Sequence, residues 1–148
     1  MTVDANVAVL PKEDAPLRIE QVRLPDPGPH QVIVRQFASG VCHSQLHQMH
    51  ERRSQPVILG HESTGVVLAR GSEVSHVDEG DHVLVTWVPR DVERSGRVRP
   101  PATLEVSDGT AVSQNVFTWA DHTIADEQYV VKAPKDLRTD VTAVIGCA

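Results

Sequence analysis

The chain contains two cysteines, Cys42 and Cys147, and eight histidines, the residue types best suited to metal binding or nucleophilic chemistry. A disulfide between the two cysteines would close a long loop, a stabilising link in an oxidising compartment. The stretch from Met1 to Leu10 lacks the basic region and long apolar segment of a secretory signal, so we expect a cytoplasmic protein. Reduced thiols among histidines indicate a metal or catalytic site, with two inert buried thiols as the alternative.

Three positions, Cys42, His61 and Cys147, are candidate ligands of a zinc ion. Zinc prefers tetrahedral sulfur and nitrogen ligands, and a catalytic site uses three protein ligands so that water or substrate can take the fourth position. The chain has no Cys-x-x-Cys pair, so spacing alone does not select these three from two cysteines and eight histidines.

A short helix is predicted from about His43 to His50 by the spacing of its apolar residues. Along it, His43, His47 and His50 recur at i, i+4 and i+7 and fall on one face. A separate two-histidine metal site on that face is one interpretation, but we favour solvated histidines or a proton relay.

The elements that must position these residues are mostly short strands. Runs of β-branched residues are separated by Gly, Pro, Asp or Asn about every ten residues, which favours a barrel or a sandwich. A second short helix is expected from Thr139 or Asp140, as N-cap, towards the end of the chain. The strand candidates are Val7–Leu10, Leu17–Val22, Gln31–Phe37, Ser63–Ala69, His82–Val88, Thr103–Val106, Val116–Ile124 and Tyr129–Lys132, with a hairpin turn at Asp108–Gly109.

Length and charge exclude several classes of protein. The 148 residues correspond to one domain, residues 1–148. The formal net charge is −6 and the basic residues form no block, so we expect no nucleic-acid partner. No apolar stretch is long enough to cross a bilayer, so we expect no membrane partner either.

Four segments carry a resemblance to a known family. Residues 40–47 read Gly-Val-Cys-His-Ser-Gln-Leu-His, 59–66 read Leu-Gly-His-Glu-Ser-Thr-Gly-Val, 80–83 read Gly-Asp-His-Val, and 145–148 read Ile-Gly-Cys-Ala. In this order they resemble the N-terminal catalytic domain of zinc-dependent alcohol dehydrogenases in the medium-chain dehydrogenase/reductase superfamily. The resemblance implies a mostly-β fold, a GroES-like, partly open β-barrel with a few short helices.

The resemblance also implies a metal site. Cys42, His61 and Cys147 match the three ligands of a catalytic zinc, and Glu62 matches a carboxylate that approaches the metal and assists ligand exchange. Zinc is a Lewis acid that lowers the pKa of an alcohol hydroxyl, and the deprotonated alcohol is a good hydride donor to NAD or NADP. The expected partners are therefore a small alcohol or aldehyde and a nicotinamide cofactor.

Four further residues receive roles from the same resemblance. Ser44 matches a hydroxyl that contacts the substrate oxygen, and His47 matches an imidazole that passes the proton to solvent. His43 occupies a position that faces the cofactor pyrophosphate in many relatives, and Trp87 one that lines the substrate pocket. Taken alone, Ser44 reads as a helix-start hydroxyl and Trp87 as a core residue.

Two departures concern the metal chemistry. Many relatives bind a second, structural zinc through four closely spaced cysteines, but the corresponding stretch, Trp87 to Asn115, contains none. We therefore expect one catalytic zinc and no structural zinc. Gln45 stands where relatives often carry an acidic residue that supports the zinc ligands, so the metal site is expected to be tuned differently.

A third departure is that no Gly-x-Gly-x-x-Gly motif follows a strand, so a Rossmann domain is absent from this sequence. We expect NAD or NADP to be bound only through a missing dinucleotide-binding domain, and the chain alone to be inactive. The face left uncovered should be partly apolar and should favour self-association.

Two other functions are compatible with the same fold. One is a non-enzymatic GroES-like binding or assembly module, which the cysteine and histidine set disfavours. The other is a zinc-free reductase of the same superfamily, whose members lack the two ligand cysteines that are present here.

Overall fold

The structure is a computed structural model that describes residues 2–12, 15–91 and 96–147. Strands dominate these residues, and helices are few and short. The strands are β1 (Val3–Leu10), β2 (Arg18–Leu24), β3 (Gln31–Ser39), β4 (Val57–Ile58), β5 (Glu62–Arg70), β6 (His82–Thr86), β7 (Thr103–Val106), β8 (Gly109–Val112), β9 (His122–Asp126) and β10 (Val130–Lys132). The helices are α1 (His43–His50), the 3₁₀ turn η1 (Glu127–Tyr129) and α2 (Thr139–Thr142).

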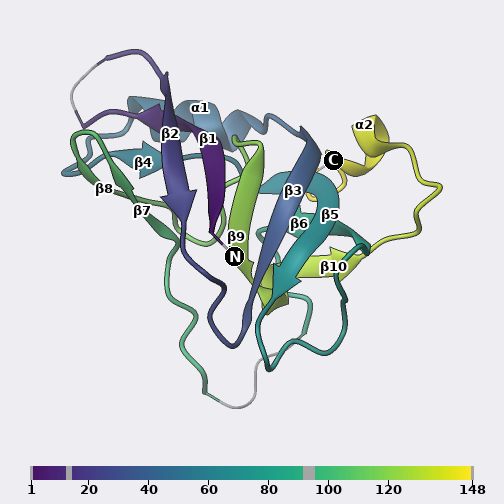
Figure 1. Ribbon diagram of the computed structural model, residues 1–148. Coiled ribbons are helices and arrows are strands. Elements are labelled where there is room, and N and C mark those ends of the chain that lie inside the picture. The colour runs from purple at the N-terminus through teal and green to yellow at the C-terminus, as the bar shows by residue number, and fades with distance from the viewer. Residues whose placement is uncertain (1, 13–14, 92–95, 148) are drawn as a thin grey trace.

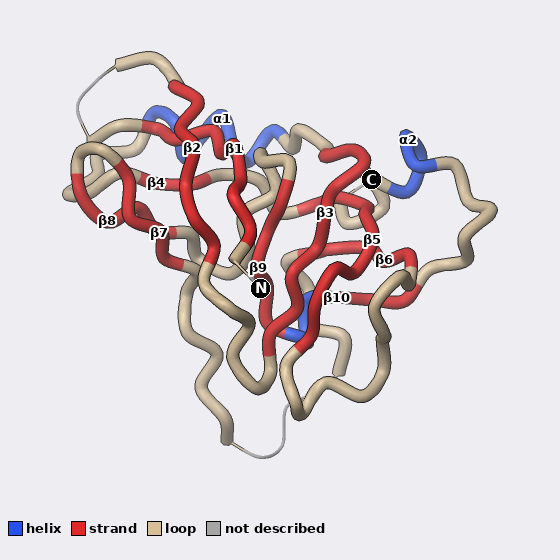
Figure 2. Tube along the Cα trace, in the orientation of Figure 1, coloured by secondary structure: helices blue, strands red, loops and turns tan. Residues whose placement is uncertain are grey.

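The strands form two five-stranded sheets, in the orders β2-β1-β4-β8-β7 and β10-β6-β5-β3-β9. The sheets curl towards each other, with α1 across one end and α2 beside β5 and the C-terminus (Figures 1 and 2). Val7 and Ala120 form an isolated bridge between β1 and the segment before β9, where the N–H of Ala8 also donates to the carbonyl of Trp119 at 2.8 Å. The predicted mostly-β fold with a few short helices is confirmed.

The core is aliphatic, as expected for a chain with 3% aromatic residues. One cluster packs inside the first sheet, where alternate residues of β1 (Ala5, Val7 and Val9) have no exposed surface. Phe117 is buried in this cluster. A second cluster of mostly valines lies under β3, β5, β6 and β10. The period of two along β1 therefore places its apolar face inward.

Most predicted elements are present, but three expectations need correction. The helix His43–His50 and the hairpin at Asp108–Gly109 are confirmed. The strand predicted at Val116–Ile124 begins only at His122, because residues 116–121 form a crossing segment that buries Val116 and Phe117 and pairs with β1 only through the isolated bridge at Ala120.

The second helix is also shorter than expected. It ends at Thr142, and its N-cap is Arg138 rather than Thr139 or Asp140. Turns follow α2, and in them the N–H of Val144 donates to the carbonyl of Val141 at 3.3 Å. Strand β4 was not predicted, since two residues carry no period. No helix among the described residues is long and apolar enough to cross a membrane.

The two edge strands of the first sheet are joined by polar contacts around Glu20. Glu20, on β2, accepts hydrogen bonds from the N–H and hydroxyl of Ser107, at 2.7 and 2.9 Å. Arg18 donates to Glu20 at 2.5 Å and also to Asp108 in the β7–β8 turn. Burial raises the pKa of Glu20, but the bonds from Ser107 and Arg18 outweigh it and hold that pKa below its ordinary value.

We predict that Glu20→Gln lowers the free energy of unfolding by about 1 kcal/mol at neutral pH, because the amide replaces a charged acceptor. Since the folded-state pKa of Glu20 is lowered, its contribution is present above the unfolded-state pKa and lost as the pH falls through the folded-state pKa. Urea denaturation of the wild type and of Glu20→Gln, at neutral pH and at about pH 3, should show a smaller difference in unfolding free energy in acid. Glu105→Gln, on β7, is the control, and an equal Glu20→Gln effect at both pH values would contradict the assignment.

Candidate metal and substrate site

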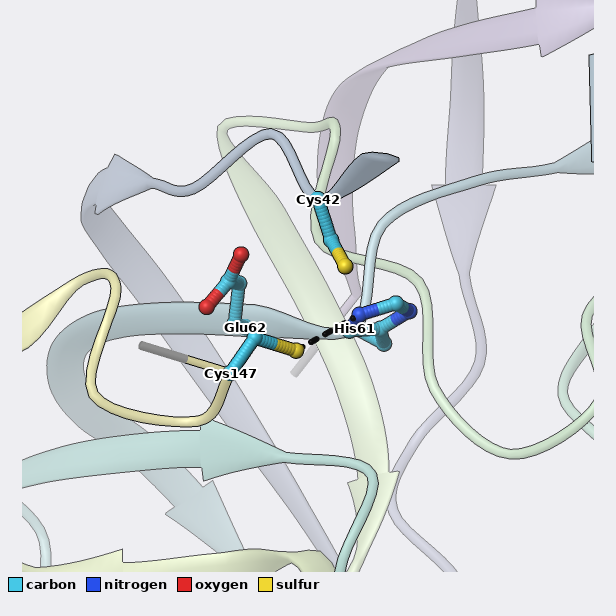
Figure 3. Close-up of side chains that lie close together, drawn as sticks. All are labelled: Cys42, His61, Glu62 and Cys147. Carbon is cyan, nitrogen blue, oxygen red and sulfur yellow. Dashed lines mark hydrogen bonds between the residues drawn. The ribbon is translucent and has the colours of Figure 1, made fainter. Parts of the chain in front are cut away.

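Four side chains with metal-binding atoms meet at one point of the structure. One ligand atom from each of Cys42, His61, Glu62 and Cys147 lies within 4.8 Å of all the others (Figure 3). Nε2 of His61 lies 3.0 Å from Sγ of Cys147. Among the described residues this is the one group of this kind. The structure thus brings together the three predicted zinc ligands and the predicted neighbouring carboxylate.

These side chains come from three segments that are distant in sequence. Cys42 is the N-cap residue of α1, and Glu62 is the first residue of β5, directly after His61. Cys147 follows the turns after α2. Strand β5 lies between β3 and β6 in the second sheet, so the His61–Glu62 pair is held by ladders on both sides.

Two glycines allow the backbone to approach the site closely. A Cβ atom on Gly40 would lie 2.6 Å from the carboxyl carbon of Glu62. Gly60, with a φ of +94°, turns the chain into His61, and a Cβ there would lie 2.4 Å from Oγ1 of Thr118 and 2.6 Å from the backbone nitrogen of Trp119. Any larger residue would have to displace these neighbours.

The cluster is electron-rich and partly buried. Burial raises the pKa of Glu62, which is 3% exposed, and its Oε2 atom is buried without a hydrogen-bond partner. Burial also raises the pKa of the Cys147 thiol, to about 11, and lowers the pKa of His61. A hydrogen bond from Ser44, at 3.3 Å, lowers the pKa of Cys42. Two sulfurs, an imidazole nitrogen and a carboxylate oxygen gathered at one point form a donor set that fits a soft divalent metal.

The imidazole of His61 is oriented from its other side by Gln45. The amide nitrogen of Gln45 lies 3.1 Å from Nδ1 of His61 and donates to Oε1 of Gln48 at 2.8 Å. Gln45 is 2% exposed, and its own Oε1 is buried without a partner. The sequence analysis noted Gln45 as a departure from the family, but Gln48 gave no signal in the sequence.

A cavity of about 330 Å³, here called the inner cavity, opens beside the cluster. Trp87, 47% exposed, lines it, donates from its indole N–H to the carbonyl of Gly146 at 3.3 Å, and meets the ring of His61 edge to face. The complete lining is Cys42, Ser44, Gln45, Gln48, Ile58, Leu59, Gly60, His61, Trp87, Ser113, Gln114, Asn115, Val116 and Cys147.

Two predicted residues do not line this cavity. His43 and His47 are exposed on α1, and their rings contact each other edge to face with centroids 4.9 Å apart. Residues that the sequence analysis missed include Ile58, Leu59 and Ser113. Ile58 belongs to β4, Leu59 follows it, and Ser113 lies directly after β8, where short elements left no periodic signal.

The fold and this site together define a GroES-like barrel that carries a cluster of thiol, imidazole and carboxylate groups. The profile of the Alcohol dehydrogenase GroES-like domain matches residues 28–135, and the chain belongs to that family.

Known proteins resemble the chain along its whole length. It is 35% identical, over 156 residues, to an alcohol dehydrogenase of Rhizobium meliloti, an alignment that covers 100% of this chain and 44% of the relative. It is 32% identical, over 161 residues, to the NADP-dependent alcohol dehydrogenase C of Mycobacterium tuberculosis, covering 99% of this chain and 45% of the relative. The chain therefore spans less than half the length of these curated relatives.

Solved structures support the fold. An alcohol dehydrogenase zinc-binding domain protein from Burkholderia ambifaria superposes with a TM-score of 0.81 at 24% identity, covering 99% of this chain and 46% of that chain. Benzyl alcohol dehydrogenase from Acinetobacter calcoaceticus gives a TM-score of 0.79 at 23% identity, covering 98% and 45%.

We predict that Gly60→Ala destabilises the fold more than Gly80→Ala does. Both positions have positive φ, +94° and +86°, so each alanine costs about 1–3 kcal/mol of backbone strain. A Cβ at position 80 meets nothing within 4 Å, whereas the one at position 60 overlaps Thr118 and Trp119 and should add about 1–3 kcal/mol. Urea denaturation measures both. Equal losses would show that the close approach at Gly60 carries no energetic weight.

Proposed function

We propose that this chain is the catalytic domain of a zinc-dependent alcohol dehydrogenase. The observation that carries the proposal is the meeting of Cys42, His61 and Cys147 beside a cavity of about 330 Å³. Three protein ligands leave a fourth position for substrate, as in catalytic zinc sites. A binding or assembly module would have no use for this set, so its presence favours the enzyme.

The residues of the cluster have the chemistry that a zinc ion requires. Two thiol sulfurs and one imidazole nitrogen would bind it, and the buried carboxylate of Glu62 lies close enough to exchange with them. When bound, zinc would lower the pKa of an alcohol hydroxyl in the inner cavity. One carboxylate oxygen of Glu62, Oε2, is buried without a hydrogen-bond partner, so it is available to a metal in the cluster.

Gln45 prepares His61 for that role. For Nε2 of His61 to bind a metal, Nδ1 must carry the ring proton, and Gln45 must present its amide oxygen to it. Gln45 and Gln48 can satisfy this by exchanging the positions of their amide oxygen and nitrogen, without a change in shape. A neutral amide makes the imidazole a weaker electron donor than a carboxylate would.

The polar route for the proton begins at Ser44. Ser44 lines the inner cavity, and its hydroxyl, now donating to Cys42, can hold the hydroxyl of an alcohol. His47 lies one helical turn further along α1 and is exposed, so it can pass a proton to water. We assign Ser44, His47 and Glu62 to catalysis and proton movement.

The substrate is proposed to be a primary or secondary alcohol, or the corresponding aldehyde or ketone. Trp87, Ile58 and Leu59 provide an apolar wall that excludes water from the reacting group. Relatives named alcohol dehydrogenase and sorbitol dehydrogenase support this class of substrate. One methylene group more or less should change selectivity by about 1–3 kcal/mol.

The hydride acceptor is proposed to be NAD or NADP, bound by a dinucleotide-binding domain outside the described residues. The relatives, more than twice as long as this chain, support that view. His43, exposed at the start of α1, is proposed to face the cofactor pyrophosphate. Exposed apolar side chains next to the site, Trp87, Val88 and Ile145, are available to be covered by that domain. Self-association through this face stays a prediction.

We predict that the purified chain binds one zinc ion, and that Cys42→Ser, His61→Ala and Cys147→Ser each weaken binding strongly. Native mass spectrometry and metal analysis measure the stoichiometry. His122 lies on β9 and contacts Asp121. Its variant His122→Ala is the matched control and should bind zinc normally. Joined to a cofactor domain, the wild-type protein should oxidise alcohols with NAD or NADP. Full zinc binding by all three variants would refute the proposed ligands.

We predict that Gln45→Leu weakens zinc affinity by about 10- to 100-fold, because the ring proton of His61 loses its acceptor. Gln45→Glu should restore or increase the affinity, since a carboxylate is a better acceptor. Competition with a chromophoric chelator measures both variants, and Gln21→Leu, on an exposed position of β2, is the control. Unchanged affinity in Gln45→Leu would show that the contact is only a packing contact.

A further inference from the structure

A second cavity adjoins the inner cavity and extends it away from the metal cluster. It has a volume of about 150 Å³ and is here called the outer cavity. The two cavities share Ile58, Leu59, Gln48, Ser113 and Gln114 in their linings. Together they form one cleft that runs from the cluster, under the C-terminal end of α1, towards the surface.

The junction of the two cavities has two chemically different sides. Ile58 and Leu59, from β4 and the residue after it, are buried and apolar. Gln48, on α1, and Ser113 and Gln114, after β8, are polar. A ligand that crosses the junction therefore meets aliphatic groups on one side and hydrogen-bonding groups on the other.

The polar side has unused hydrogen-bonding capacity. Ser113 is 8% exposed, and its hydroxyl oxygen is buried with no hydrogen-bond partner. Gln48 uses one atom of its amide to bond Gln45, and within the described part of the chain its other amide atom has no partner. A buried hydroxyl without a hydrogen-bond partner is energetically unfavourable. A ligand group that forms the missing hydrogen bond is therefore bound more tightly.

We propose that the junction is a subsite for a second hydroxyl group of the substrate, bound by Ser113 and Gln48. The inference rests on the proposed function and names its substrate class: a diol or polyol whose reacting hydroxyl lies at the metal cluster. The second hydroxyl, some carbons away, exchanges hydrogen bonds with Ser113 and Gln48 while the carbon chain packs on Ile58 and Leu59.

A hydroxyl fits this subsite better than a carboxylate does. The free amide atom of Gln48 is a donor or an acceptor, depending on how the Gln45–Gln48 pair is oriented, and a hydroxyl can satisfy either. The outer cavity is lined by Glu51, Arg52 and Arg53, so one acidic group stands beside two basic ones there. Arg53 already donates to the carbonyls of Met49 and Glu51, at 3.2 and 3.1 Å.

The experiment compares terminal diols with alkanols in which a methyl group replaces the second hydroxyl, for chains of propane to hexane length. The full chain is loaded with cobalt(II), and binding is followed by the visible spectrum of the metal and by the fluorescence of Trp87. Hydrophobicity alone favours the alkanol of each pair, so tighter binding of the diol requires specific hydrogen bonds. We expect one chain length at which the diol binds about threefold to tenfold more tightly.

The variants separate the subsite from the rest of the cleft. Ser113→Ala and Gln48→Met should each remove most of the diol's advantage, and Ser113→Ala should leave alkanol binding within about twofold. Ser72→Ala, on a distant turn, is the control and should keep the advantage. Because Gln48 also contacts Gln45, Ser113→Ala is the cleaner of the two, and its urea denaturation profile confirms that it is folded.

Each outcome bears on a different claim. If alkanols shift the cobalt spectrum and no diol binds more tightly than its partner, the subsite is overturned and the proposed function stands. If a hydroxy acid binds more tightly than the diol and loses that advantage in Arg52→Met, the subsite is anionic and the hydroxyl proposal is wrong. If no alcohol shifts the spectrum, the proposed function itself fails.

Discussion

The mutual approach of two sulfurs, an imidazole and a carboxylate is the constraint on which the rest of the structure depends. Their ligand atoms lie within 4.8 Å of one another, and burial lowers the pKa of His61 and raises the pKa of Glu62. These side chains come from three segments that are distant in sequence, so the fold must bring them together. Strand β5 does so most directly, because pairing with both β3 and β6 fixes the position of His61 and Glu62 at its start.

The surrounding elements serve that geometry in different ways. Gly40 and Gly60 let the backbone come within contact distance of Glu62 and Thr118, where a side chain could not fit. The polar contacts of Glu20 and Arg18 join the edges of the first sheet, which carries β4 and the cavity wall. The contacts at Glu20 are thus linked, through strand pairing within the first sheet, to β4 and to the part of the cavity wall that Ile58 provides.

Much of the fold could be predicted from the sequence, because alternation along strands and the Asp108–Gly109 turn are local signals. The site was predicted only through a resemblance, since the spacing of Cys42, His61 and Cys147 reveals nothing about their meeting. Residues 116–121 were misassigned as a strand because a crossing segment that buries Val116 and Phe117 has the same β-branched and aromatic composition. The two residues of β4 lie below the length at which any period can be recognised.

The amides of Gln45 and Gln48 connect the two ends of the cleft. Gln45 contacts Nδ1 of His61, and Gln48 contacts Gln45 while lining both cavities. Because each amide has one donor end and one acceptor end, the orientation that suits His61 also decides which atom Gln48 offers to a ligand. A carboxylate at position 45 would accept at both contacts and leave no such choice. The tautomer of the histidine and the polarity of the distant subsite are therefore set together, by hydrogen bonds alone.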